Sequence, residues 1–227
     1  PAVKLKDLPP AANTIVLITK IGVIIIESNT KNVKDLNESV GNRKEQIIAT
    51  AVELFSENGY DNTPIRLLAN KTELSVAGLY YFFKDKEEIL FSIIISSLKK
   101  FNDTLSAVCK GGDPQCNLRL MLKNLLKHVI EHKKEISIVV QENKRLNPEQ
   151  LKAIRIEKRR AYDFVKGELI KLKKLGRLKS ANLAPAVYSF FSMIFWCLRW
   201  YKPEGALTVE EVATELANIY FSGILKE

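Results

Sequence analysis

The chain has 227 residues, of which 46% are hydrophobic and 27% are charged, the composition of an ordinary soluble globular protein. This length allows one small domain and one medium-sized domain, and ten glycines and eight prolines exclude a fibrous or low-complexity chain. Three cysteines are too few for a disulfide framework, so we expect reduced thiols. The formal net charge of +9 lies mainly at residues 144–179, which hold thirteen basic and four acidic residues.

Residues 1–42 differ from the rest of the chain. Ile15 to Ile26 (IVLITKIGVIII) are mostly apolar and β-branched, which favours a strand, or adventitious packing, over a helix. This run is too short to span a bilayer, and it lacks the cleavage site of a signal peptide. We therefore treat residues 1–42 as an N-terminal extension of unassigned role, and we expect a cytoplasmic protein without a membrane partner.

From residue 43 onward, the apolar residues recur with the period of a helix. This pattern predicts helices at 43–58, 64–71, 75–82 and from 86 to about 108. Thr63 is the expected N-cap of the second helix, Ser75 of the third and Asp85 of the fourth. Three short helices joined by tight turns and followed by a capped fourth are typical of a helix-turn-helix unit.

The remaining residues also indicate helices. Helix starts are indicated by Asp113-Pro114, Asn147-Pro148, Asn182 and the capping box Thr208–Glu211, and a shorter helix holds Ile136, Val139 and Val140. No strand pattern follows residue 26, and no internal repeat is visible. The sequence therefore predicts an all-α fold of about nine helices.

Residues 75–82 have an unusual composition for a core helix. Hydroxyl groups can bond DNA phosphates, and small side chains let a helix backbone lie close to a groove. The residues of these two kinds are Ser75, Ala77, Gly78, Tyr80 and Tyr81. The alternative is that the tyrosine pair packs in the core.

The stretch from Arg43 to Leu90 resembles the TetR family closely. The shared features are an arginine-led first helix, the "LF…GY…T" junction at Leu54–Thr63 and the "LYY-F-K-KEE" run at Leu79–Glu88. The resemblance implies a DNA-binding domain at 43–90 and a helical regulatory and dimerisation domain at 91–227. It also implies contacts with a double-stranded operator from Arg43, Thr63, Arg66, Ser75, Val76, Ala77, Gly78, Tyr80, Tyr81, Lys84 and Lys86.

The stretch departs from the family pattern at two positions. Glu73 stands where the turn usually has glycine, so we expect Glu73 to adopt the backbone angle that glycine would favour. Phe82 replaces a frequent histidine. Because the third helix offers few side chains for bidentate base contacts, readout is expected to depend on Arg66, apolar contacts and DNA shape.

The regulatory half carries a second resemblance. Residues 137–146 and 198–211 are similar to the TetR repressors of fatty-acid and steroid-ring degradation, which release DNA on binding an acyl-CoA. The implied partner is a small hydrophobic effector, an acyl-CoA, bound by Arg155, Arg159, Tyr162, Phe191, Phe195, Trp196 and Trp200. The basic run at Arg155, Lys158, Arg159, Arg160 and Lys166 would meet the coenzyme A phosphates.

The aromatic residues and the basic run also have simpler explanations. The aromatic residues could form the core or a dimer interface, and the basic run could be a solvated helix face. In the resembling family the last two helices form a four-helix bundle across a homodimer axis. The implied interface residues are Phe190, Ile194, Val212, Leu216, Ile219 and Tyr220. A regulator of an efflux pump that responds to hydrophobic drugs is the alternative within this class.

Enzyme functions are not favoured by the sequence. His128-Val-Ile-Glu-His132 matches a short zinc-peptidase pattern, but catalytic zinc needs a third protein ligand and the chain has no other histidine. No phosphate-binding glycine-rich loop or nucleophile elbow is present. We expect no catalytic residue, no metal and no cofactor. A metal-dependent hydrolase and a helical protein–protein adaptor are the alternatives from other classes.

Overall fold

The computed structural model describes residues 14–19, 22–27, 30–108, 111–141 and 145–226, with side chains from residue 40 onward. The chain divides into two compact units, one ending at Ile47 and the other beginning at Ile48. The predicted all-α fold is confirmed: the described residues form nine helices, together with one hairpin of two strands.

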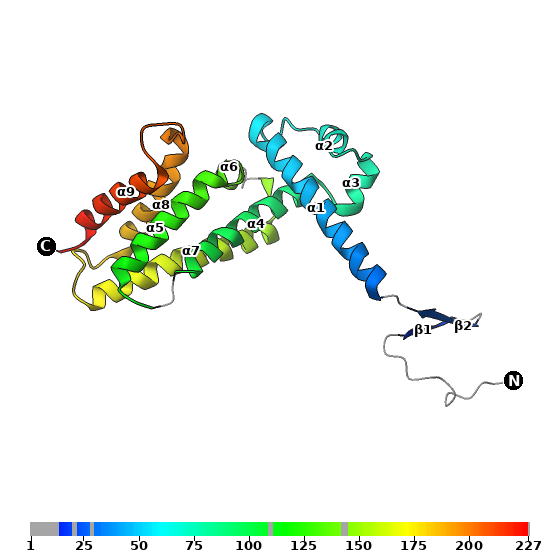
Figure 1. Cartoon of the computed structure of the whole chain (residues 1–227), viewed down its shortest axis with the longest axis horizontal. Coiled ribbons are helices and arrows are strands. Elements are labelled where there is room, and N and C mark those ends of the chain that lie inside the picture. The colour runs from blue at the N-terminus through cyan, green and yellow to red at the C-terminus, as the bar shows by residue number, and fades with distance from the viewer. Residues whose placement is uncertain (1–13, 20–21, 28–29, 109–110, 142–144, 227) are drawn as a thin grey trace, which may run out of the picture. The chain divides into compact units, whose positions relative to one another are not determined.

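The hairpin lies in the first unit. Strand β1 (Thr14–Thr19) pairs antiparallel with β2 (Gly22–Glu27), so that Ile15 lies opposite Ile26 (Figure 1). The preference of this apolar run for strand over helix is confirmed. Helix α1 spans Thr30–Asn58, so it begins well before the predicted start at residue 43. Val33, Leu36 and Val40 recur at helical spacing within residues 30–42, a signal that the assignment of 1–42 to a separate extension passed over.

The second unit contains the end of α1 and all later helices. These are α2 (Ile65–Lys71), α3 (Val76–Phe82), α4 (Lys86–Ser106), α5 (Pro114–Glu131), α6 (Lys133–Gln141), α7 (Pro148–Lys174), α8 (Leu183–Trp200) and α9 (Val209–Ile224). Each start from α3 onward agrees with the predicted cap or pattern to within a few residues.

Side chains at the helix starts explain these bounds. Ser75 Oγ accepts a hydrogen bond from Gly78 N at 2.9 Å, and Asp85 accepts one from Glu88 N at 2.7 Å. Thr208 and Glu211 form the predicted capping box. Each bond satisfies an N–H group that a helix leaves without an internal partner, and a cap of this kind contributes about 1 kcal/mol.

The predicted N-cap at Thr63 is wrong. Thr63 is fully buried, and its Oγ1 donates hydrogen bonds to the carbonyls of Gly59 (2.8 Å) and Leu54 (3.2 Å). The hydroxyl therefore closes the end of α1, and the N-cap position of α2 is Pro64, without a side-chain cap.

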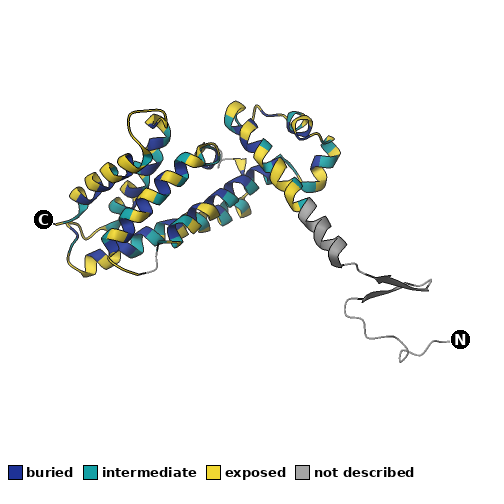
Figure 2. Ribbon diagram, viewed as in Figure 1, coloured by how far each residue is buried: buried dark blue, intermediate teal, exposed yellow. Residues whose placement is uncertain are grey.

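The core of the regulatory half lies among α4, α5, α7, α8 and α9. Helix α5 packs against all four of the others, and its buried stripe faces inward (Figure 2). Among the described residues, one charged side chain is buried there: the Glu168 carboxylate accepts from Asn117 Nδ2 at 3.0 Å and from Lys171 Nζ at 2.5 Å. Both of its oxygens have partners, which offsets the cost of burying the charge.

Candidate DNA-binding surface and ligand pocket

Helix α3 presents its tyrosines to solvent. Leu79 is fully buried under the helix, whereas the side chains of Tyr80 and Tyr81 are 44% and 77% exposed. The Tyr81 ring meets Phe82 edge-on, with the ring centroids 5.1 Å apart. The alternative placement of this pair in the core is therefore wrong, and α3 has a free polar face.

The turn before α3 depends on Glu73. Its φ is +55°, and it is the only non-glycine residue with a positive φ among those the structure describes. Two backbone hydrogen bonds hold the turn, from Glu73 N to Asn70 O at 3.1 Å and from Leu74 N to Ala69 O at 2.9 Å. The expectation that Glu73 adopts a backbone angle suited to glycine is confirmed.

Most of the candidate DNA contacts lie on the surface of α2, α3 and the turn after it. Val76 and Gly78 are half-buried, and the exposed residues are Arg66, Ser75, Ala77, Tyr80, Tyr81 and Lys84. Arg43 belongs to the first unit, is half-buried and donates to Gln46 Oε1 at 2.9 Å.

Two candidates are placed differently from the others. Thr63 is buried at the end of α1, so its side chain cannot touch DNA. Lys86 donates to the carbonyl of Tyr60, and its Nζ lies 4.1 Å from the centre of the Tyr60 ring. Because an ammonium has three donors, these contacts leave Lys86 able to meet a phosphate, and we remove only Thr63 from the candidate set.

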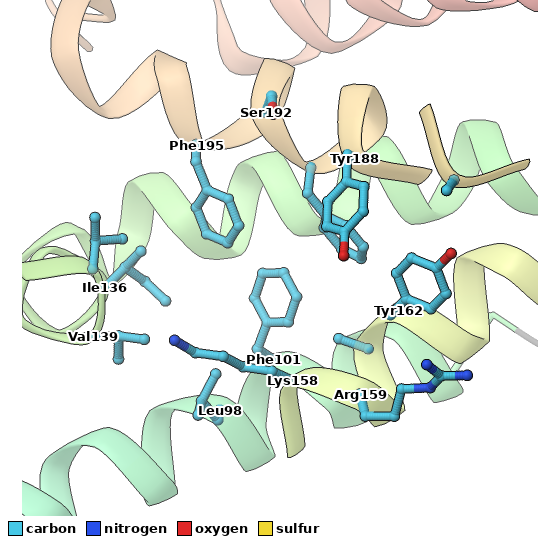
Figure 3. A pocket seen from close by; sticks show the side chains of 14 residues that line it. Leu98, Phe101, Ile136, Val139, Lys158, Arg159, Tyr162, Tyr188, Ser192 and Phe195 are labelled. Atoms are coloured by element: carbon cyan, nitrogen blue, oxygen red, sulfur yellow. The ribbon is translucent and has the colours of Figure 1, made fainter. Parts of the chain in front are cut away.

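A pocket opens among α4, α6, α7 and α8 (Figure 3). Its volume is about 740 Å³, within the range of roughly 300–1,000 Å³ usual for small-molecule sites. The lining residues are Leu98, Phe101, Ile136, Val139, Val140, Lys158, Arg159, Ala161, Tyr162, Ala184, Tyr188, Phe191, Ser192 and Phe195.

The pocket walls are mainly aromatic. The rings of Phe101 and Phe195 stack with centroids 5.8 Å apart, and Phe191 lies 6.2 Å from Phe101. Tyr162 of α7 and Tyr188 of α8 form a second pair at 5.6 Å. Such walls suit a flexible apolar ligand, because they offer a large contact area at little conformational cost.

Two cations of α7 line the same pocket, and they differ in environment. Arg159 Nε lies 3.0 Å from the Asp163 carboxylate, and its guanidinium stands over the Tyr162 ring at 5.2 Å. Lys158 is exposed as a residue but extends its ammonium into the cavity (Figure 3), and partial burial lowers the pKa of that ammonium. The pocket therefore combines an apolar interior with positive charge on one wall.

The pocket contains four of the seven candidate ligand residues: Arg159, Tyr162, Phe191 and Phe195. Arg155, Trp196 and Trp200 do not line it, and the two indoles are 66% and 47% exposed. We therefore remove Trp196 and Trp200 from the ligand set, and keep Arg155 only as a candidate contact outside the cavity. The sequence pattern missed the wall formed by α4 and α6, since nothing local indicates that Phe101 and Ile136 meet across the fold.

The candidate interface residues fall into two groups. Phe190, Ile194, Val212 and Tyr220 are buried in the core of the protomer itself, and the Tyr220 hydroxyl donates to the carbonyl of Ala186 at 2.9 Å. They cannot meet a partner chain while the core is intact. Leu216 is half-buried and Ile219 is 63% exposed, so these two remain available.

The two histidines lie together near the end of α5. The rings of His128 and His132 are 4.6 Å apart, and burial lowers the pKa of His128, with His132 adding to the effect. Among the described residues, no group of three His, Cys, Asp or Glu side chains is arranged to hold a metal ion.

A helix-turn-helix unit with an exposed polar helix, joined to a helical domain with an apolar pocket, defines a class: the DNA-binding regulators that respond to small ligands. Residues 47–93 match the bacterial regulatory proteins of the tetR family, and residues 111–224 match the tetracyclin repressor-like C-terminal domain. The chain belongs to the tetR family and is a DNA-binding transcriptional regulator, not an enzyme.

Several relatives resemble the chain over different lengths. The repressor KstR2 of Rhodococcus jostii (strain RHA1) is 24% identical over 188 residues, covering 80% of this chain and 91% of that protein. The regulator YuxN of Bacillus subtilis (strain 168) is 32% identical over 101 residues, 44% of this chain and 35% of that protein. The crystal structure of AibR with isovaleryl coenzyme A and operator DNA is 28% identical, covers 79% of this chain and 98% of AibR, and has a TM-score of 0.73.

Proposed function

We propose that the chain is a homodimeric repressor that binds a palindromic operator and releases it when an acyl-CoA occupies the pocket. The observation that carries this proposal is the pocket itself: an apolar cavity of about 740 Å³ with two cations of α7 in its wall. A ligand with a hydrocarbon tail and an anionic head matches both features. The AibR structure, which holds isovaleryl coenzyme A together with DNA, supports the same ligand class.

The acyl tail would lie among the aromatic side chains. Burial of one methylene contributes about 0.8 kcal/mol, so each added pair of carbons should tighten binding roughly tenfold until the cavity is full. The steepest dependence on chain length is expected for tails that reach between Phe101, Phe191 and Phe195.

The coenzyme A phosphates would lie outside the cavity, along the basic face of α7. Arg155 and Arg160 are exposed there, and Arg160 lies 4.0 Å from Glu157. Exposed charge pairs are weak and are screened by salt. Affinity for an acyl-CoA should therefore fall only partly as salt rises, because the tail contribution does not depend on salt.

Pocket chemistry bears on the efflux-pump alternative. Among the residues that the structure describes, the lining contains Lys158 and Arg159 and no acidic residue. Because Arg159 is paired with Asp163, a cationic lipophilic drug would meet the like charge of Lys158 there, which disfavours binding. The pocket therefore favours an anionic effector over a cationic drug.

The operator contacts would come from the exposed face of α2 and α3. Arg66 would read base edges, and Tyr80 would bond a phosphate, which sets the register without specifying sequence. Tyr81 is 77% exposed. Its loss should weaken DNA binding without weakening the fold.

The proposal is tested with purified protein and a fluorescent fragment of its own upstream DNA. We expect salt-dependent binding that Arg66→Ala or Tyr81→Ala weakens at least tenfold, with thermal midpoints within a few degrees of wild type. Acyl-CoAs of increasing chain length should release the fragment. If none binds below about 100 μM, roughly −5.5 kcal/mol, the effector assignment is refuted and only the DNA-binding function stands.

A further inference from the structure

The two neighbouring cations of the pocket point in different directions. Arg159 turns toward Tyr162 and is already paired with Asp163 at 3.0 Å. Lys158 runs the other way, across the cavity, and its ammonium ends on the side where Ile136 and Val139 of α6 lie (Figure 3). Its aliphatic stem therefore passes over apolar residues. The residue as a whole is exposed, so its ammonium lines the pocket and keeps part of its contact with solvent.

Lys158 makes no hydrogen bond or ion pair with any residue whose side chain the structure describes. Partial burial lowers its pKa, and no carboxylate among the described residues acts in the opposite direction. Charges that lose water are usually paired, because an unpaired charge beside apolar groups is costly.

We propose that Lys158 binds a carboxylate inside the pocket, so that the effector carries its anion on the part that the cavity encloses. The inference rests on the proposed function and narrows its ligand class. A plain hydrocarbon acyl-CoA would leave the ammonium without a partner. Two ligand chemistries supply one: a free long-chain carboxylic acid, and the coenzyme A monothioester of a dicarboxylic acid, whose second carboxylate lies at the far end of the tail.

The expected preference follows from the strength of such a pair. A charge-assisted hydrogen bond between ammonium and carboxylate is about twice as strong as a neutral one. Inside a partly dry pocket it should favour the carboxylate ligand roughly tenfold to a hundredfold over a neutral ligand of equal length. That preference should disappear with the Lys158 charge.

The test is titration calorimetry on the full chain with four ligands of one chain length. These are dodecanoic acid, 1-dodecanol, dodecanoyl-CoA and the CoA monothioester of dodecanedioic acid. Lys158→Met removes the charge and keeps most of the side-chain volume. Lys152→Met is the matched control, because Lys152 is exposed on the same helix and does not line the pocket.

We expect wild type and Lys152→Met to bind dodecanoic acid at least tenfold more tightly than 1-dodecanol, and the dicarboxylic monothioester more tightly than dodecanoyl-CoA. Lys158→Met should lose both preferences while it still binds the alcohol and keeps its thermal midpoint. If the gain in affinity of the acid over the alcohol is the larger one, the effector is a free carboxylic acid. If the gain of the monothioester over dodecanoyl-CoA is larger, the effector is a dicarboxylic acyl-CoA.

Failures of the two proposals are distinguishable. If wild type binds these ligands and releases the operator but Lys158→Met keeps the same preferences, the carboxylate inference is wrong and the effector function stands. If wild type binds none of the four ligands, the pocket is not an acyl effector site and both proposals are overturned.

Discussion

Glu73 carries a conformational cost that one substitution should remove. A non-glycine residue in the left-handed region costs about 1–2 kcal/mol, and glycine loses part of that gain because it is freer in the unfolded chain. We expect Glu73→Gly to raise the free energy of unfolding by up to about 1 kcal/mol, and the thermal midpoint by roughly 2–4 °C. Operator binding should not weaken, since the change also removes a negative charge beside α3.

Two controls separate this cause from a general effect of losing Glu73. Glu73→Ala keeps the left-handed cost and should not stabilise the protein. Glu215→Gly, at an exposed position inside α9, should destabilise it by about 1 kcal/mol, because glycine is unfavourable within a helix. Thermal scans that place Glu73→Gly at or below wild type would contradict the prediction.

Some residue-scale features could be predicted because their causes are local. The cap at Ser75 and the strained turn at Glu73 follow from hydrogen bonds and sterics within a few residues. Thr63 could not be placed in this way, because its partner Leu54 comes from the preceding helix. In the sequence, Lys158 looks like several other cations of the same helix. Its place in the pocket becomes visible only when α4 and α6 pack together and form the facing walls.

At the scale of elements, α6 connects the pocket with the DNA-binding module. Ile136 and Val139 line the cavity, while Lys134 of the same short helix forms an ion pair with Glu53 of α1. A second ion pair joins Arg145 to Asp61, in the turn after α1. A ligand that shifts α6 therefore acts on the contact between α6 and α1.

We expect Lys134→Ala to weaken the effect of the ligand on DNA affinity. An exposed pair contributes at most about 1 kcal/mol, so the thermal midpoint should hardly change. Ligand affinity should also stay the same, because Lys134 does not line the pocket. The measured quantity is the ratio of operator dissociation constants with and without saturating acyl-CoA, which should fall several-fold.

The neighbouring Lys133→Ala is the matched control on the same helix, and it should keep the wild-type ratio. The exchanged pair Lys134→Glu with Glu53→Lys should restore part of the ratio, since the attraction is restored with its signs reversed. Equal ratios for Lys134→Ala and Lys133→Ala would exclude this ion pair from the coupling.

Helix positions were largely predictable, and pocket walls were not. The caps Asp85, Asn147 and Thr208 lie within a few residues of the N–H groups they bind, so each helix start is determined by the local sequence. The pocket requires four helices at defined spacings, and its α4 and α6 walls consist of ordinary apolar residues. For the same reason, periodicity could not separate the inward Phe195 from the outward Trp196 on α8.

At the scale of the whole molecule, the outer face of α8 and α9 lacks a covering layer. Trp196 and Trp200 of α8 and Ile219 of α9 are 66%, 47% and 63% exposed. The inner face of α8 packs on the core while the two indoles face outward, so the helix is apolar on both faces. Among the described helices, α8 is the one long and apolar enough to cross a bilayer, a test that core helices also pass. A second copy of the same two helices would cover this face and give the proposed dimer.

The dimer proposal is tested by placing charge on that face. We expect Trp196→Glu and Ile219→Glu to convert a dimer into a monomer in sedimentation velocity at micromolar concentration, because a stable interface buries at least about 1,000 Å² and tolerates no unpaired central charge. Leu175→Glu, at an exposed leucine just after α7, is the control and should remain dimeric. Operator affinity should fall with the dimer, since half-sites one helical turn apart need two linked recognition helices. A wild-type chain that sediments as a monomer and still binds its operator tightly would refute the arrangement.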